Sequence, residues 1–158
     1  MDSWNNLFLS EEDLIPLLTE RLAEGQTVRY LPFRGISMLP LLRQGKDSVQ
    51  LSPLPERLEK YDLPVYRYPS GKYVMHRIVR TEKNHYICLG DNTYRYEFIT
   101  RDMMLGIVTA IRRGDRVISV KNPVYRAYCR LWCSIFPVRL VLWKGKNLLR
   151  EWLKGRLL

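Results

Sequence analysis

The sequence predicts a mainly β fold with antiparallel strands, preceded by one helix and followed by amphipathic helices. From Thr27 to about Val120, short runs of β-branched and aromatic residues alternate with Gly and Pro, which is typical of antiparallel strands. Leucines at helical spacing precede this stretch, and apolar and basic residues at helical spacing follow it. The 158-residue chain is therefore divided into an N-terminal helical segment (1–26), a β domain (27–120) and a basic amphipathic helical tail (121–158).

The N-terminal segment carries the signals of a helix start. Ser10 supplies a side-chain acceptor, and the acidic residues that follow it suit the first turn of a helix. Leu14, Leu18 and Leu22 recur every four residues and form one apolar face, which ends near Gly25. Pro16 disfavours an unbroken helix at its position.

Seven strands are expected in the β domain. They are Val28–Phe33, Ser48–Leu51, Val65–Tyr68, Tyr73–Arg80, His85–Leu89, Leu105–Arg112 and Arg116–Val120, with turns at Lys83-Asn84 and Gly114-Asp115.

Three short segments stand in the order that a serine peptidase needs. Gly35-Ile36-Ser37-Met38-Leu39-Pro40 supplies a hydroxyl on a loop, Met75-His76-Arg77-Ile78 a base, and Leu89-Gly90-Asp91-Asn92 a carboxylate. The chemistry requires a fixed nucleophile, a base within hydrogen-bond reach, and a group that orients the base. Each segment alone is also an ordinary turn or strand, so their combination is the signal.

These segments, followed by Leu105-Gly106 and Val108, resemble the ordered motifs of the signal peptidase superfamily of serine proteases, over roughly residues 33 to 112. The superfamily has the signal-peptidase/LexA-like β fold. Some of its members use lysine as the base, whereas the endoplasmic-reticulum and archaeal type uses histidine. His76 makes this chain similar to the histidine type. Signal peptidases carry a membrane span before the serine, and residues 1 to 34 contain no such apolar run.

The resemblance implies Ser37 as the nucleophile, His76 as the base and Asp91 as the acid that supports it, without a metal or other cofactor. The Ser37 backbone amide is the implied oxyanion donor. Residues expected to shape the site or position the substrate are Gly35, Met38, Pro40 and Asn92. The implied substrate is an extended peptide that pairs with strands beside the site.

Other interpretations of these residues remain open. Strand alternation puts His76 on one face with Val74 and Ile78 and turns Arg77 the other way, which also fits a buried structural histidine. His85 is the rival base, close to a turn. Gly90-Asp91-Asn92 makes a good tight turn, and the rival acids are Asp47, Asp62 and Asp102.

The tail holds most of the formal net charge of +10, because nine basic residues and one acidic residue follow from Lys121 onward. Aromatic and basic residues at helical spacing favour an anionic membrane surface, with helix breaks at Pro137 and at Gly145. The expected membrane contacts are Trp132, Arg139, Trp143, Lys144 and Trp152. A partner protein or the chain's own β core are alternative surfaces for the tail. Nucleic acid is disfavoured, because the tail is too apolar and no recognition motif is present.

Function and location follow from these parts. We expect a serine endopeptidase that makes limited cleavages in a peptide or precursor protein, such as a leader or signal-like peptide, at the cytoplasmic face of a membrane. Three cysteines without zinc spacing, and the absence of an export signal, favour the reducing cytoplasm. The alternatives are a non-catalytic peptide- or membrane-binding module on a peptidase fold and, disfavoured by the short N-terminus, a self-cleaving regulator.

Overall fold

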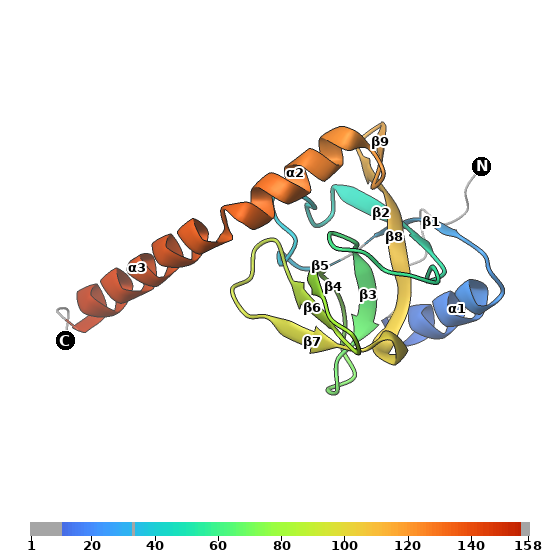
Figure 1. The fold of residues 1–158 in the computed structure, drawn as a ribbon, viewed down its shortest axis with the longest axis horizontal. Helices are drawn as coiled ribbons and strands as arrows, with labels where there is room; N and C mark the ends of the chain where they lie inside the picture. The colour runs from blue at the N-terminus through green and yellow to red at the C-terminus, as the bar shows by residue number, and fades with distance from the viewer. Residues whose placement is uncertain (1–10, 33, 156–158) are drawn as a thin grey trace.

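Two antiparallel sheets and three helices build the chain (Figure 1). The structure is a computed structural model that describes residues 11–32 and 34–155. About 30% of the chain is in strands, so the fold is mixed α/β with antiparallel sheets, and the expectation of a mainly β fold is only partly confirmed. Two residues of the expected elements, Ser10 and Phe33, lie outside the described residues.

The larger sheet has the strand order β1-β2-β8-β3-β4, and β9 pairs with β8. Its strands are β1 (Val28–Pro32), β2 (Asp47–Ser52), β3 (Pro64–Arg67), β4 (Tyr73–Met75), β8 (Met104–Arg113) and β9 (Arg116–Ser119). Alternate residues of β2 are buried, as the period of two in a strand requires for a sheet with one face on the core. The strands β1 and β4 are the two ends of the described order.

The smaller sheet has the order β5-β6-β7, with β5 (Arg77–Thr81), β6 (Tyr86–Leu89) and β7 (Glu97–Ile99). The sequence predicts one strand from Tyr73 to Arg80, and this prediction is wrong. The chain leaves the larger sheet after β4 and enters the smaller sheet at β5, so His76 lies at the crossing point. Strand alternation does not continue through this point, and Arg77 is fully buried beside a buried His76.

Helix α1 (Glu11–Ala23) packs against the larger sheet through Leu18 and Leu22, which are buried. The helix approaches β8 closely at Gly106, where an added Cβ would lie 2.8 Å from the Ser52 carbonyl oxygen and 3.0 Å from Leu22 Cδ1. Pro16 is inside α1 and does not end it.

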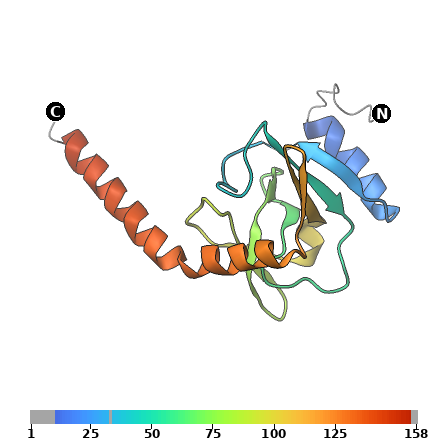
Figure 2. The same cartoon turned by 90° about the horizontal axis from the view of Figure 1, so that it is seen from above.

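The tail forms α2 (Pro123–Ser134) and α3 (Phe136–Gly155). The Asn122 side chain caps α2 by accepting from the backbone N–H groups of Val124 and Tyr125. The helices are separated just before Pro137, whereas Gly145 does not interrupt α3. In both views α3 extends beyond the sheets (Figures 1 and 2), and Figure 2 shows that it bends away from α2. Within the described residues, no helix is both long and apolar enough to cross a membrane.

The buried residues form two clusters, one for each layer of the fold. The first lies between the larger sheet and helices α1 and α2, and it includes Met38, Leu51 and Cys129. The second lies between the two sheets and includes Tyr66, Ile78 and Cys88. His76 is at the edge of the second cluster, where its neighbour Tyr66 is also fully buried.

Candidate functional site

His76 is held by a carboxylate, and that carboxylate belongs to Glu97. His76 Nδ1 lies 2.7 Å from Glu97 Oε2, and the His76 residue is only 4% exposed. A carboxylate only accepts hydrogen bonds, so the neutral imidazole carries its proton on Nδ1 and leaves Nε2 as an acceptor. This tautomer is the one that a general base needs.

Two tyrosines hold Glu97 in place. The hydroxyls of Tyr66 and Tyr68 donate to its two carboxylate oxygens, one to each. Burial by itself would raise the pKa of Glu97, but the hydrogen bonds from His76, Tyr66 and Tyr68 outweigh it and hold this pKa below its usual range. Burial and the Glu97 charge raise the pKa of both tyrosines, so both remain donors. The carboxylate beside His76 is therefore ionised at neutral pH.

Ser37 lies on the other side of His76. Gly90 separates them: an ideal Cβ on Gly90 would be 2.8 Å from the Ser37 carbonyl oxygen and 3.0 Å from His76 Cδ2. The Ser37 carbonyl oxygen and His76 Cδ2 therefore both lie within 3.0 Å of the position of a Gly90 Cβ. His76 Cδ2 is bonded to Nε2, the ring nitrogen that faces away from Glu97. The Ser37 backbone and the basic edge of His76 are neighbours.

Among the described residues, no hydrogen bond joins the Ser37 hydroxyl to His76. Such bonds in peptidases are often long until substrate is bound. The groups that the structure brings together are thus the Ser37 backbone, the His76 ring and the Glu97 carboxylate.

The loop that carries Ser37 is fixed through its backbone. Asn92 N–H donates to the Ser37 carbonyl at 2.7 Å, and the Asn92 side chain donates to the Ile36 carbonyl. Gly35 N–H donates to the Gln44 side chain, Met38 is buried in the first cluster, and the Pro40 carbonyl accepts from Arg113. The side chain of Ile36, beside the serine, is exposed.

Asp91 does not contact His76, so the expectation that it supports the base is wrong. Its two carboxylate oxygens accept from Arg77 Nε and Nη2 at 2.8 and 2.7 Å, and Tyr128 donates to the same carboxylate. Arg77 is fully buried and Asp91 is 3% exposed. Burial lowers the pKa of Arg77, but hydrogen bonds and charge from Asp91 reverse this effect and raise it, so the guanidinium stays charged.

The Arg77–Asp91 pair joins β5 to the C-terminal helices. Arg77 Nη1 also donates to the Tyr125 hydroxyl and to Cys129 Sγ on α2. The Asp91 backbone carbonyl accepts from Trp132 and from Arg139. These two side chains, expected at a membrane, are bound to the body of the protein instead.

The rival residues lack the geometry of a catalytic pair. The ring of His85 packs against Phe98. Asp47 is paired with Arg43 and Arg113, and Asp62 accepts a backbone N–H from Glu59. Among the described residues, only Glu97 places a carboxylate on a histidine.

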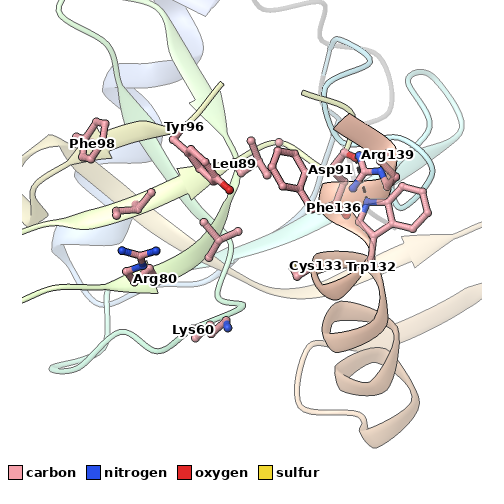
Figure 3. Close-up of a pocket in the computed structure, with 13 residues that line it drawn as sticks. Lys60, Arg80, Leu89, Asp91, Tyr96, Phe98, Trp132, Cys133, Phe136 and Arg139 are labelled. Carbon is pink, nitrogen blue, oxygen red and sulfur yellow. Dashed lines mark hydrogen bonds between the residues drawn. The ribbon is translucent and has the colours of Figure 1, made fainter. Parts of the chain in front are cut away.

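A cavity of about 400 Å³ lies beside this site (Figure 3). One wall is the outer face of the β5-β6-β7 sheet, with Leu89, Tyr96 and Phe98, and the other wall is α2 and α3, with Trp132 and Phe136. Cationic side chains of Lys60, Arg80 and Arg139 also line it. Ser37 and His76 are not among its lining residues, but Gly90 and Asp91 are, so the cavity adjoins the candidate site.

Glu97 is the functional residue that the sequence analysis missed. Its strand is only three residues long, and only Asp residues were considered as rivals. The alternation Tyr96-Glu97-Phe98 predicts the opposite, because aromatic residues in a strand usually face the core and would turn the glutamate to solvent. In the structure Phe98 is exposed and Glu97 faces His76, Tyr66 and Tyr68, so no pattern in the sequence singles it out.

Comparisons of the chain with protein-family models, with curated proteins and with solved structures found no match. The site is therefore interpreted from its own geometry.

The buried ion pair predicts a large loss of stability in Asp91→Asn. The substitution leaves the Arg77 charge buried without its counter-ion, which costs roughly 3–5 kcal/mol in the free energy of unfolding. Urea unfolding measures this difference. Asp102→Asn, the same chemical change at an exposed position, is the control and should stay within about 0.5 kcal/mol of the unaltered chain. A small effect at Asp91 would contradict the structural role assigned to it.

The lowered pKa of Glu97 predicts a pH-dependent contribution to stability. Ionised Glu97 stabilises the folded chain fully above the ordinary glutamate pKa of about 4.3, and this contribution disappears as the pH falls through the lower folded-state value. The stability difference between the unaltered chain and Glu97→Gln should therefore shrink as the pH is lowered from about 6 to about 3. Glu56→Gln, at an exposed position, should show no such trend. A difference that grows toward acid pH would refute the assignment.

The close approach at Gly90 predicts that Gly90→Ala separates the serine from the histidine. The added methyl group would collide with the Ser37 carbonyl and the His76 ring, so one of them must move. We expect at least about a tenfold loss in the rate at which a serine-directed reagent labels Ser37, because a displacement of about 1 Å costs this much or more. Gly114→Ala, in the β8–β9 turn, is the control for a general effect of altered glycine. Unchanged labelling in Gly90→Ala would show that Ser37 and His76 do not act together.

Proposed function

We propose that this chain is a serine endopeptidase that makes limited cleavages in a peptide or precursor protein, with Ser37 as nucleophile, His76 as base and Glu97 as the acid that orients His76. The observation that carries the proposal is the buried His76, with one ring nitrogen on the Glu97 carboxylate and the opposite ring edge at the Ser37 loop. The motifs that resemble the histidine type of the signal peptidase superfamily support the same roles for Ser37 and His76.

In the proposed chemistry His76 first accepts a proton and then returns it, and Ser37 first forms and then loses an acyl bond. His76 Nε2 accepts the Ser37 proton as Oγ attacks the scissile carbonyl, and the carbonyl oxygen becomes an oxyanion near the Ser37 backbone amide. Glu97 stabilises the imidazolium that forms. His76 then returns the proton to the leaving amine, and a water molecule, activated in the same way, hydrolyses the acyl-enzyme.

The strand order supports an extended peptide as substrate. Ser37 follows β1 and His76 follows β4, and these two strands are opposite ends of the larger sheet. The Ser37 backbone and His76 are neighbours at Gly90, so the loop that follows β1 and the residue that follows β4 meet at the site. A substrate strand could pair with the outer edge of β4 and present its scissile bond there.

The proposed place of this reaction is the cytoplasmic face of a membrane. The basic helix α3, which extends from the body of the protein, supports this location (Figure 2). The substrate at this surface would be a leader or a signal-like segment of a precursor.

A non-catalytic peptide-binding module is the second candidate function. The cavity between the β5-β6-β7 sheet and the C-terminal helices favours it, because an apolar wall with cationic side chains can bind peptide without any chemistry (Figure 3). In that case Ser37 would be unreactive.

Labelling with a fluorophosphonate probe, measured by intact mass, separates the two candidates. We expect one adduct on the unaltered chain, none on Ser37→Ala, and labelling slowed by roughly 10²–10⁴-fold in His76→Ala. Glu97→Gln should slow labelling at least about tenfold, because the correct tautomer and its charge are no longer stabilised.

The matched controls are Ser70→Ala and His85→Ala, which change the same residue types away from the site and should label normally. An adduct that survives Ser37→Ala would contradict the assigned nucleophile. No adduct on the unaltered chain would favour the binding module. Full labelling of Asp91→Asn molecules that remain folded is also expected, because Asp91 does not contact His76.

A further inference from the structure

Helix α3 carries an apolar stripe that remains largely exposed among the described residues. The stripe consists of Val138, Val141, Leu142, Leu148, Leu149 and Trp152, which recur at helical spacing and are 53% to 68% exposed. The opposite side of α3 packs on the body: Phe136 is buried, and Trp143 stacks on Tyr94 with ring centroids 4.7 Å apart. The tail therefore does not use its most apolar face to cover its own β core.

Basic side chains flank this stripe on both sides. At about 100° per residue, Lys144 falls beside one edge of the stripe, and Lys146 and Arg150 fall beside the other. All three are exposed, and α3 contains five basic residues against the single acidic residue Glu151. An apolar face between two rows of cations matches a bilayer surface, where the apolar side chains enter the acyl boundary and the cations remain among anionic headgroups.

Other occupants fit this helix less well. A second copy of the chain would bring the same basic rows together, and the like charges would repel each other. A nucleic acid would bind the cations but would leave the apolar stripe in water.

We propose that α3 binds the surface of an anionic membrane through the apolar stripe and the flanking basic residues Lys144, Lys146 and Arg150. Trp132 and Arg139, which the sequence predicts at the membrane, both bind the Asp91 carbonyl and are not part of the stripe. Trp143 stacks on Tyr94, whereas Trp152 is on the stripe, 53% exposed, and Lys144 flanks it.

The contacts of α3 with the body connect this surface to the candidate site. Arg139 holds the Asp91 carbonyl and stacks on Trp132, with its guanidinium carbon 4.1 Å from the ring centroid. Tyr94, which stacks on Trp143, lies in the same segment between Gly90 and Glu97. Membrane-bound α3 therefore keeps the Ser37 loop beside the bilayer, and this part of the inference rests on the proposed peptidase function. The substrate class it names is a peptide segment close to a membrane surface.

Vesicle flotation of the full chain tests the proposal, and the Ser37→Ala variant is used so that no peptidase chemistry contributes. The probes are vesicles of pure phosphatidylcholine and vesicles in which about a third of the lipid is phosphatidylglycerol. We expect binding to the anionic vesicles only, weakening as salt is raised, with a blue shift of tryptophan emission as Trp152 enters the acyl boundary.

Leu142→Glu combined with Leu149→Glu places two charges in the stripe and should weaken anionic vesicle binding at least about tenfold. Both positions are exposed, so α3 should keep its helicity by circular dichroism. Val117→Glu, an exposed apolar residue on β9, is the matched control and should bind as the parent does. Replacing Lys144 and Lys146 by Gln should weaken binding at low salt. At high salt, where the lysine charges are screened, the difference between this variant and the parent should disappear.

Four outcomes would overturn the proposal: no flotation at low salt, equal binding to neutral vesicles, flotation unchanged in the double Leu→Glu variant, or a dimer that this variant dissociates while vesicles do not bind. These outcomes are independent of the peptidase assignment. Ser37 labelling without flotation would leave the proposed function standing, and flotation without labelling would leave the membrane surface standing.

Discussion

The buried ion pair between Arg77 and Asp91 is the constraint on which the rest of the structure depends. A guanidinium with no exposed surface is costly unless its nitrogens have partners, and each guanidinium nitrogen of Arg77 bonds to Asp91, Tyr125 or Cys129. Arg77 is on β5, Asp91 is in the β6–β7 loop, and Tyr125 and Cys129 are on α2, so the bonds of one charge join three elements. The Ser37 loop is attached to the same assembly, because Asn92, next to Asp91, clasps its backbone. Helix α2 is therefore part of the fold, whereas most of α3 extends beyond it.

Two carboxylates close to one another in sequence have different tasks because their surroundings differ. Asp91 faces a permanent cation and serves stability, whereas Glu97 faces a histidine and two tyrosines, which are donors that still allow proton transfer at the ring. Glu97 accepts from His76 Nδ1, which fixes the tautomer of the neutral ring and leaves Nε2 as the acceptor. The two carboxylates therefore lie on different partners, one on a buried cation and one on the candidate base.

The sequence indicated the general organisation and two of the three candidate site residues, and its failures have physical causes. Strand positions were predictable where burial alternates, as in β2. The change of sheet at His76 was not predictable, because Tyr73 to Thr81 has the composition of one continuous strand and only the pairing of distant strands divides it. Asp91 and Glu97 could not be told apart by type, since the choice depends on which cation or histidine each one meets in space. The sequence could not show that Trp132 and Arg139, predicted as membrane contacts, donate to the Asp91 backbone carbonyl, because a helix wheel does not give the position of that carbonyl.

The free edge of β4 has a consequence for how such a site would select its targets. Recognition by strand pairing uses main-chain groups that every peptide has, so it discriminates weakly among sequences. Discrimination must then come from which peptides are present at the site. A site held at a surface meets segments confined to that surface at a far higher effective concentration than free peptides in bulk solution. Such an enzyme would select its substrates by their location more than by their sequence. Detaching α3 would then broaden the range of peptides cut and slow the cleavage of peptides confined to the surface.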